Sequence, residues 1–448
     1  MNPPATRKTN ARELALGVVT DVFAPQQQQR GAQAAFDYRA RRSDLDGRDR
    51  AFAAELAYGA IKMRRLLDWY ARPYLAGRAK PLPPAIAEIL RLGIYQLVVM
   101  GGVDAHAAVF ETVNLALHHG HRGTAGLVNA ILRRVAAEPP LAPDPSDFES
   151  ENDYLGTRYS LPTWIVAQLR GALGNELEAA LGGLNAAPQH AVRTNALKAG
   201  VAEVEALLGE RGIEVRRSPF VSDVLIAPSG GLADDPEARW FVQSEAAAIP
   251  VDLLAPAPGE RVVDFCSGRG NKSLQIGAAL GERGTLLCVE RDERKAQRLP
   301  EILAHAGVTT AATIAADAST LVLDEAVDAA LVDAPCSGIG VIGRHPEARW
   351  RKQPADGEGH VALQHALLAS ATRALRPGGR LVYSVCSIDP REGAHVVAAL
   401  LAQEPALVRD VVPERFAPFR SGEGELIVPP GLDGRDGFFV AALRRSSG

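Results

Sequence analysis

The 448-residue sequence has few cysteines and no long apolar run. Its four cysteines form no C-x-x-C pair, which argues against a disulfide framework and against a zinc site; they are Cys266, Cys288, Cys336 and Cys386. No stretch approaches the roughly 18 to 20 apolar residues that a membrane-spanning helix needs. The first residues also lack the sustained apolar segment of a signal peptide. We therefore expect a cytoplasmic protein that uses no metal and no membrane.

The sequence also lacks a strong net charge. Its 49 basic and 53 acidic residues give −4, which at first sight argues against a nucleic-acid partner. The charge is unevenly distributed, however, at +7 over residues 1–140, −8 over 141–245 and −3 over 246–448. A charge run is most often a solvated face, but this asymmetry favours phosphate contact by the first segment. Its basic residues include Arg39, Arg41, Arg42, Arg48, Arg50, Arg133 and Arg134.

The apolar pattern divides the chain into parts, and its length alone allows two to four domains of about 100 to 200 residues each. Up to about residue 137, apolar residues recur at the three and four spacing of amphipathic helices, and a proline-rich acidic stretch follows. From 240 onward, apolar strands alternate with helical segments, which predicts a parallel sheet covered on both faces. We therefore predict a multidomain protein: an all-α domain at 1–140, a linker at 141–155, a small α+β module at 156–240 and a C-terminal α/β domain at 241–448 with a mostly parallel sheet.

A nucleoside-binding pattern begins the C-terminal part. The apolar strand 261–266 leads into SGRGNKS and a helix, and the next strand, 285–290, ends in Glu290, 22 residues after Gly268. Small residues let the backbone approach a ligand, and an acid after the second strand can accept both ribose hydroxyls. Because Ser273 stands where a dinucleotide site prefers glycine, a nucleoside without pyrophosphate is favoured; the alternative is a plain tight turn. Asp317, after the third strand, either binds an adenine amino group or caps a helix.

Two cysteines follow the fourth and fifth strands of the same region. Cys336 lies in DAPCSGIG after Asp333, and Cys386 lies in YSVCSIDP. A cysteine is usually an inert apolar residue, which we expect of Cys288. Methylation at carbon 5 of a pyrimidine, in contrast, needs a thiolate that adds at carbon 6 and a carboxyl group near N3. One thiolate and one carboxyl group are the minimum, and a second thiol would assist release.

These motifs resemble those of a known family, the S-adenosylmethionine-dependent RNA cytosine-C5 methyltransferases of the RsmB/Sun/Nop2 type. DAPCSGIGVIGRHPEARWR, LQHALLASATRALRPGGRLVYSVCSIDPRE and DGFFVAAL follow the family's order and spacing. The resemblance implies a Rossmann-like class I methyltransferase domain in which Cys386 is the nucleophile, Asp333 contacts base N3 and N4, and Cys336 acts in product release. It also implies that the S-adenosylmethionine pocket is formed by Cys266, Ser267, Gly268, Arg269, Gly270, Asn271, Lys272, Glu290, Arg294, Asp317, Asp333 and Pro335.

The N-terminal region has a resemblance of its own. ILRLGIYQL and ETVNLALHHGHRGTAGLVNAILRRV resemble the NusB-like RNA-binding domain that is fused to this methyltransferase in the bacterial branch acting on 16S rRNA. The resemblance therefore implies formation of 5-methylcytosine in 16S rRNA, and we expect the protein to be a monomer. Trp350 either stacks on a base or is buried under its loop. The residues expected to contact RNA are Arg193 and Asn195 in PQHAVRTN, and Arg344, His345, Arg349 and Arg351 after DAPCSG.

Two departures from the family pattern leave alternatives open. In the first loop, Arg269 replaces a proline and Asn271 replaces a glycine. Asparagine tolerates a left-handed backbone, and Arg269 either meets the cofactor's methionine carboxylate or faces solvent. Glu392-Gly393-Ala394 replaces the family's Glu-Asn-Glu, which weakens helix capping. The competing hypothesis is an RNA-binding protein with weakened catalysis, and a third keeps the chemistry but places it on tRNA or another rRNA.

Overall fold

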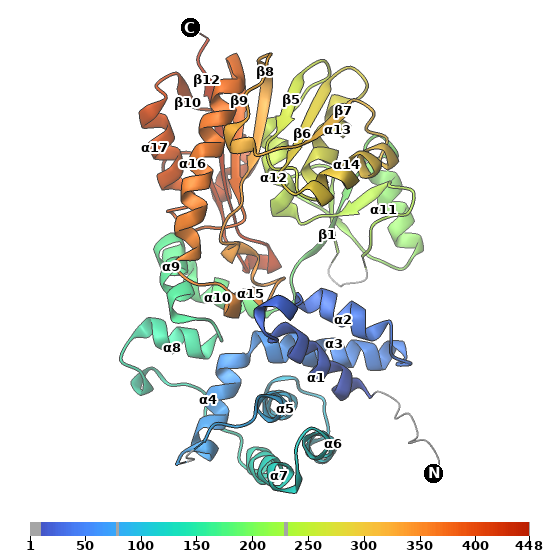
Figure 1. The fold of residues 1–448 in the computed structure, drawn as a ribbon, viewed down its shortest axis with the longest axis vertical. Coiled ribbons are helices and arrows are strands. Elements are labelled where there is room, and N and C mark those ends of the chain that lie inside the picture. Colours follow the sequence, from blue (N-terminus) through green and yellow to red (C-terminus); the bar gives the residue numbers. More distant parts are fainter. Residues whose placement is uncertain (1–9, 78–79, 228–231, 448) are drawn as a thin grey trace. The chain divides into compact units, whose positions relative to one another are not determined.

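The computed structural model of the chain describes residues 10–77, 80–227 and 232–447 (Figure 1). The described chain forms two compact units. The first contains the residues up to Gln168 together with His345–Arg351, and the second contains Leu169–Arg344 and the residues from Lys352 onward. The segment His345–Arg351 therefore packs within the first unit, although the second unit precedes and follows it in the sequence.

The first unit is helical. Three of its helices begin at a side chain that satisfies a free amide of the first turn: Asn10, Asp46 and Asp104 each accept a hydrogen bond from the backbone three residues on. Their apolar faces meet in one core that includes Leu56, Ile89 and Leu132. The helices are α1 (Ala11–Val22), α2 (Ala32–Ala40), α3 (Gly47–Lys62), α4 (Arg64–Leu75), α5 (Pro84–Ile94), α6 (Ala105–His118), α7 (Arg122–Ala137), α8 (Glu151–Arg158) and α15 (Ala348–Arg351).

The proline-rich stretch differs in detail from the expected linker. A short helical turn spans Pro145–Asp147, and Ser150 caps α8, whose first residue is Glu151. The helix therefore starts inside the range 141–155 that the sequence pattern assigns to a linker. The next helix, α9 (Thr163–Leu173), continues from the first unit into the second.

A small sheet opens the second unit. Its four strands are antiparallel to their neighbours in the order β2-β3-β1-β4. Val192, Leu225 and Trp240 pack one side of it against a helix. The elements of this module are α10 (Leu177–Asn185), β1 (His190–Thr194), α11 (Val201–Glu210), β2 (Arg216–Arg217), β3 (Val224–Ala227) and β4 (Trp240–Val242).

The larger sheet has the order β10-β12-β9-β8-β5-β6-β7, and β11 pairs with β12. Strands β5 to β9 are parallel to one another, and β10, β11 and β12 are antiparallel to their neighbours. The predicted mostly parallel α/β fold is confirmed. The elements are α12 (Glu245–Leu254), β5 (Arg261–Asp264), α13 (Asn271–Leu280), β6 (Thr285–Glu290), α14 (Glu293–His305), β7 (Ala311–Ala315), β8 (Val327–Asp333), α16 (Asp356–Ala374), β9 (Leu375–Val385), α17 (Ala394–Gln403), β10 (Leu407–Arg409), β11 (Leu426–Val428) and β12 (Phe438–Arg445).

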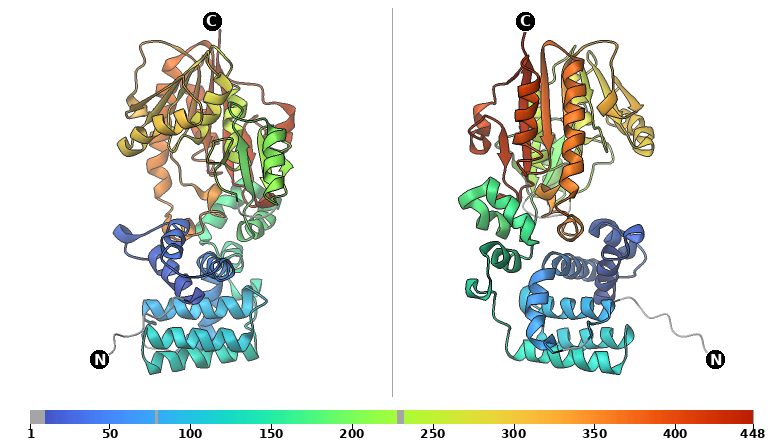
Figure 2. Two further views of the ribbon diagram at one scale, coloured as in Figure 1. Left: turned by 90° about the vertical axis from the view of Figure 1, so that its right-hand side faces the viewer. Right: turned by 60° about the vertical axis from the view of Figure 1, so that its left-hand side comes forward.

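Alternate residues of the central strand pack on opposite faces of this sheet. Val262 joins a core with residues of α12, α13 and α14, whereas Val263 joins a core with α16 and α17. Figure 2 shows helices on both faces of this sheet. Both faces are therefore covered, which leaves the carboxyl ends of the parallel strands as the open edge. Within the described residues, we find no helix with the length and apolarity to cross a membrane.

Candidate active site

The first loop, residues 265–270, is shaped by two glycines between β5 and α13. Gly268 has φ +56° and Gly270 has φ +90°, and the Gly270 amide donates to the Ser267 carbonyl at 2.8 Å. A Cβ at Gly270 would lie 2.9 Å from Leu299 Cδ2, so glycine is required there. Asn271 is the first residue of α13. Gly270, and not Asn271, takes the left-handed conformation, so the turn tolerates asparagine at 271.

Glu290 connects the end of β6 to the first loop. Its Oε2 accepts a hydrogen bond from the Gly268 amide at 2.8 Å, and its Oε1 accepts from the Asp292 amide at 2.8 Å. The side chain is largely buried, so the carboxylate is held in one orientation by backbone donors. Each oxygen keeps a further lone pair, which is the acceptor capacity that a pair of ribose hydroxyls requires.

Four further residues expected in the cofactor pocket are exposed at this edge: Arg269, Arg294, Asp317 and Pro335. Asp317 caps the helical turn Ala318–Thr320, because its Oδ1 accepts from the Ser319 amide at 3.0 Å. Hydrogen bonds from Ser319 lower the pKa of Asp317. Asp317 therefore performs the capping role, and its contact with a ligand stays a prediction.

Asp264, the last residue of β5, is a buried acid that the sequence patterns did not single out. Its Oδ2 accepts from Ser273 Oγ at 2.6 Å, and the side chain is 1% exposed. Burial, with a smaller contribution from the charge of Asp333, raises the pKa of Asp264 to about 6. The signal available in the sequence was an aspartate that ends a buried strand directly before the glycine loop.

Asp333, at the end of β8, is held by two neighbours. Its Oδ2 lies 2.7 Å from Lys272 Nζ, and its Oδ1 accepts from Ser384 Oγ at 2.7 Å. Burial acts to lower the pKa of Lys272, but the charge and hydrogen bond of Asp333, together with the charges of Cys386 and Asp264, raise it overall. Lys272 therefore stays charged against Asp333. Ser384, in β9, is a second residue that the sequence patterns did not single out.

The two cysteines predicted to act in the reaction lie side by side. Cys336 Sγ and Cys386 Sγ are 3.4 Å apart, although 50 residues separate them in the chain. The hydrogen bond between them, together with burial, raises the pKa of Cys336. The raised pKa favours the protonated form of Cys336, and either sulfur can be the donor of this hydrogen bond. We call the segments 334–340 and 386–392 the cysteine loops.

The other two cysteines are poor candidates for thiolate chemistry. Burial and the surrounding carboxylates raise the pKa of Cys266, which is expected in the cofactor pocket. Cys288 is fully buried in β6, and burial raises its pKa to about 12. Among the described residues, no group of three or more His, Cys, Asp or Glu side chains is arranged to hold a metal ion.

Arg193 and Asn195, expected to contact RNA, are buried where the small sheet meets the larger domain. Arg193 is 1% exposed, and its Nε donates to Gln243 Oε1 at 2.8 Å. Burial lowers its pKa to about 10. Asn195 Nδ2 donates to the carbonyls of Ala238 and Ala306, at 2.8 and 2.9 Å. Both side chains hold the module together in this structure, and an RNA contact by them stays a prediction.

The basic loop after the Cys336 motif divides at residue 345. Arg344, in the second unit, donates to the Gln189 carbonyl at 2.8 Å and lies 3.3 Å from Asp436 Oδ2. His345 is exposed, whereas Arg349 is fully buried, and burial lowers the Arg349 pKa to about 9. An RNA contact by these residues likewise stays a prediction.

Within the first unit, the neighbours of Arg349 in α15 bind backbone carbonyls. Trp350 Nε1 donates to the Ile61 carbonyl at 2.7 Å, and Arg351 Nη2 donates to the Val22 carbonyl at 2.6 Å. Trp350 packs against the helical core. Trp350 is thus partly buried against this core, and stacking on a base stays a prediction.

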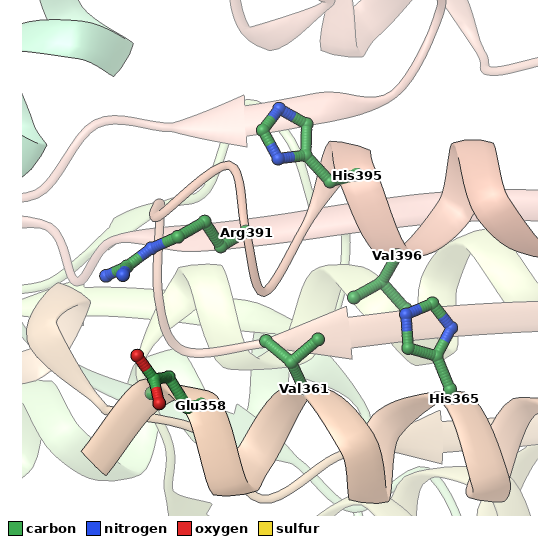
Figure 3. A pocket seen from close by; sticks show the side chains of 7 residues that line it. Glu358, Val361, His365, Arg391, His395 and Val396 are labelled. Atoms are coloured by element: carbon green, nitrogen blue, oxygen red, sulfur yellow. The ribbon is translucent and has the colours of Figure 1, made fainter. Parts of the chain in front are cut away.

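A cavity of about 370 Å³ lies beside the second cysteine loop, between α16 and α17. Figure 3 shows Glu358, Val361 and His365 on α16, facing Arg391 and the first residues of α17. Gly393 precedes α17 and supplies no side-chain cap, as expected from the shortened motif. None of the residues expected to bind cofactor or RNA lines this cavity.

Three family models match successive parts of the chain. The NusB family model matches residues 9–137, and a ferredoxin-like domain model of RsmF/B-like methyltransferases matches 161–229. The model described as 16S rRNA methyltransferase RsmB/F matches 251–444. The last match contains both cysteine loops and the first loop.

Curated relatives match over almost the whole chain. A ribosomal RNA small subunit methyltransferase B from Thermus thermophilus is 34% identical over 98% of this chain and 98% of its own. A probable enzyme of the same name from Bacillus subtilis is 28% identical over 98% and 99%. The crystal structure of PH0851 is similar in fold, with a TM-score of 0.80, 24% identity and coverage of 98% and 99%.

Proposed function

The chain belongs to the family of RsmB/F 16S rRNA methyltransferases, and from this premise we propose that it forms 5-methylcytosine in 16S rRNA, with S-adenosylmethionine as methyl donor. The observation that carries the proposal is the cluster of Cys386, Cys336 and Asp333 at the carboxyl ends of β8 and β9. This cluster contains the thiolate, the second thiol and the carboxyl group that carbon-5 chemistry needs.

The proposed first step is attack by Cys386. Its thiolate adds to carbon 6 of the cytosine, and the electron pair of the C5–C6 double bond becomes available at carbon 5. Cys336 Sγ lies 3.4 Å from Cys386 Sγ, within hydrogen-bond distance of the attacking atom. A target cytosine in folded RNA must first leave its stack to reach these groups.

Asp333 is proposed to hold the polar edge of the base. Its oxygens are oriented by Lys272 and Ser384, at 2.7 Å each, so the carboxylate cannot rotate freely. The cytosine N4 amino group donates to this carboxylate, and the charge that develops toward N3 is stabilised by the nearby Lys272 ammonium. Lys272 therefore supports Asp333, in addition to the cofactor contact expected from its place in the motif.

Release is an elimination that follows methyl transfer. A base removes the carbon 5 proton, its bonding pair re-forms the C5–C6 double bond, and the S–C6 pair returns to Cys386 as thiolate. Cys336 stabilises that leaving thiolate by the same hydrogen bond. Loss of Cys336 should therefore slow release more than attack.

The first loop fits S-adenosylmethionine. A Cβ built at Gly268 would have only the Cys266 carbonyl near it, at 3.9 Å, so the space above this turn is open to a ligand. Glu290 offers oriented carboxylate oxygens to ribose hydroxyls. When bound, S-adenosylmethionine supplies the electrophilic methyl group that carbon 5 receives. Gly268, Gly270 and Glu290 would hold it by its nucleoside part.

The assignment to 16S rRNA is supported by the names of the relatives and by the basic N-terminal unit. Arg41, Arg42, Arg48 and Arg50 are exposed there, as are Arg133 and Arg134 at the end of α7. Exposed arginines of this density favour phosphate contact. The NusB family match covers the same helices.

The competing function, an RNA-binding protein with weakened catalysis, was favoured by Arg269 and Asn271. The backbone argues against it, because Gly270 carries the left-handed turn and Arg269 is exposed. Bisulfite sequencing of rRNA from a strain lacking this gene tests the proposal. We expect one 16S cytosine to lose its mark, and an unchanged 16S pattern would refute it. Loss of a mark from tRNA or from large-subunit rRNA would instead identify that RNA as the substrate.

A further inference from the structure

A fully buried carboxylate, Glu392, joins the two cysteine loops. Its Oε1 accepts a hydrogen bond from the Ser337 amide at 2.7 Å, and its Oε2 accepts from Ser337 Oγ. Ser337 Oγ also lies 3.1 Å from Ser387 Oγ. Ser337 directly follows Cys336, and Ser387 directly follows Cys386. The three residues therefore form a link, one residue away from each thiol, between the two loops.

The backbone of Glu392 is held as well. The Tyr383 hydroxyl, in β9, donates to the Glu392 carbonyl at 2.5 Å. The last residue of the first cysteine loop contacts the first residue of the second: the Gly340 amide donates to the Cys386 carbonyl at 3.1 Å. A Cβ at Gly340 would come 2.0 Å from the Gly437 carbonyl oxygen, so this contact requires glycine. The cysteine loops are thus fixed at both ends, and Glu392 supplies the side-chain contact between them.

A buried carboxylate with this set of partners is costly to keep. His360 Nδ1 lies 3.7 Å from Glu392 Oε1, and this imidazole is charged only if protonated. Burying a carboxylate is unfavourable, and two hydrogen bonds from one serine offset only part of that cost. An apolar residue would fill the same space at lower cost. Because charge-assisted hydrogen bonds are short and directional, the retained carboxylate is suited to fixing geometry.

We propose that Glu392 is a positioning residue that holds Cys336 within hydrogen-bond reach of Cys386. Through Cys336 it sets the rate at which the covalent RNA adduct is released. The first part concerns geometry alone, and the second rests on the proposed function. Glu392 does not touch the substrate in this account; it acts through Ser337 and Cys336.

The geometric part is tested with Glu392→Gln and a bifunctional thiol reagent. Dibromobimane becomes fluorescent when two neighbouring thiolates each displace one of its bromides, so it reports the proximity of Cys336 and Cys386. A glutamine offers one acceptor oxygen and places an NH2 group against a Ser337 donor, which separates the loops. We expect the bridging rate to fall about tenfold, the loss that removal of an outer-shell partner typically causes. An unchanged rate would overturn the proposal.

A matched control separates positioning from general loss of stability. Glu425 is also buried, and its carboxylate accepts from Arg409 Nε and from Ser421 Oγ at 2.9 Å each, away from the cysteine loops. Glu425→Gln should leave bridging unchanged. If Glu392→Gln does not fold, Ser337→Ala is tested instead. This variant keeps the hydrogen bond from the backbone amide of residue 337 to Glu392, and it loses only the contacts of the Ser337 hydroxyl with Glu392 and Ser387. Its bridging rate should fall by a smaller factor, and an unchanged rate counts against the proposal.

The catalytic part is tested by trapping and by steady-state kinetics. With Glu392→Gln we expect kcat to fall up to about 100-fold, KM for S-adenosylmethionine to stay constant, and RNA to accumulate on the protein in denaturing gels. A merely structural defect would lower the active fraction without accumulating adduct. Lower kcat without adduct overturns the release role. If the wild-type protein transfers no methyl group, the proposed function fails, while the bridging result still decides the geometric part.

Discussion

The two sides of the candidate active site are built by different means. The first loop, beside β5 and β6, is shaped by backbone conformation at Gly268 and Gly270, while several side chains around it are exposed. The cysteine loops, beside β8 and β9, are held by buried side chains such as Ser337 and Glu392. The two sides therefore tolerate different substitutions. Side-chain substitutions that leave φ and ψ alone should be mild in the first loop and severe in the cysteine loops.

The largest expected effect is that of Cys386→Ala, which removes the nucleophile. Methyl transfer to RNA should be abolished, while the affinity for S-adenosylmethionine stays within about twofold, because the thiol is not part of the first loop. Radiolabelled methyl transfer and calorimetric titration measure the two quantities. Cys336→Ala, in contrast, should trap RNA on the protein. Normal turnover by Cys386→Ala would show that Cys386 is not the nucleophile, and it would contradict the greater sensitivity expected of the cysteine loops.

Asp333→Asn should lower kcat about 100-fold, the loss typical of removing one preorganised electrostatic partner. The asparagine keeps the shape but loses the charge that faces Lys272, at 2.7 Å in the wild type. Single-turnover kinetics with saturating S-adenosylmethionine isolates the chemical step. Ser384→Ala is the matched control: it removes only the second hydrogen bond to Asp333 and should cost much less. Equal losses in the two variants would contradict the role given to the charge.

Asp264 predicts a pH dependence of stability. Burial raises its folded pKa to about 6, from 3.8 in the unfolded chain, so the folded state binds this proton more tightly. Its stabilising contribution is complete below pH 4 and is lost as the pH rises through 6, by about 3 kcal/mol. Denaturant unfolding from pH 4 to 7 should show wild type losing this amount relative to Asp264→Asn. If the free energies of unfolding of wild type and Asp264→Asn change in parallel with pH, the raised pKa is not that of Asp264.

Gly270→Ala should destabilise the first loop by about 1 to 3 kcal/mol, because alanine is strained at φ +90° and its Cβ would meet Leu299. Thermal unfolding and S-adenosylmethionine binding should both weaken. Gly359→Ala is a suitable control, since a Cβ there meets nothing within 4 Å and Gly359 lies inside α16. If Gly270→Ala and Gly359→Ala lose the same stability and the same affinity for S-adenosylmethionine, the backbone conformation at Gly270 does not shape the first loop.

The smallest effect is expected from Arg269→Ala. Arg269 is exposed, and an exposed charge contributes at most about 1 kcal/mol, so the Kd for S-adenosylmethionine should change by less than about fivefold. Calorimetric titration at two salt concentrations measures it. A much larger loss would assign Arg269 to the methionine carboxylate, and would show that this side depends on a side chain as well.

Much of the fold was predictable because its signals are local. The five parallel strands and the helices between them follow from apolar runs and glycine-rich turns, and Cys336 and Cys386 follow from their motifs. The placement of β12 between β9 and β10 was not predictable from periodicity, since it depends on pairing between distant segments. The start of α8 inside the expected linker follows from the Ser150 cap, which the proline-rich composition obscured.

The missed site residues share one property: their roles depend on contacts far along the chain. Asp264 pairs with a serine nine residues on, but the effect on its pKa comes from burial by the whole domain. Glu392 meets Ser337 across 55 residues, and Ser384 meets Asp333 across 51. The burial of Arg349 within the first unit was likewise not predictable, because arginine in a basic loop is usually exposed; its contact with RNA stays a prediction.

Addition of Cys386 to carbon 6 of a cytosine can be tested with 16S rRNA that carries 5-fluorocytidine. Fluorine at carbon 5 cannot leave as a cation, so release is blocked and the covalent adduct persists. We predict one equivalent of RNA attached to the peptide that contains Cys386, identified by mass spectrometry after nuclease and protease digestion. Attachment at Cys336 instead, or methyl transfer to unmodified RNA with no adduct on the fluorinated RNA, would contradict the account.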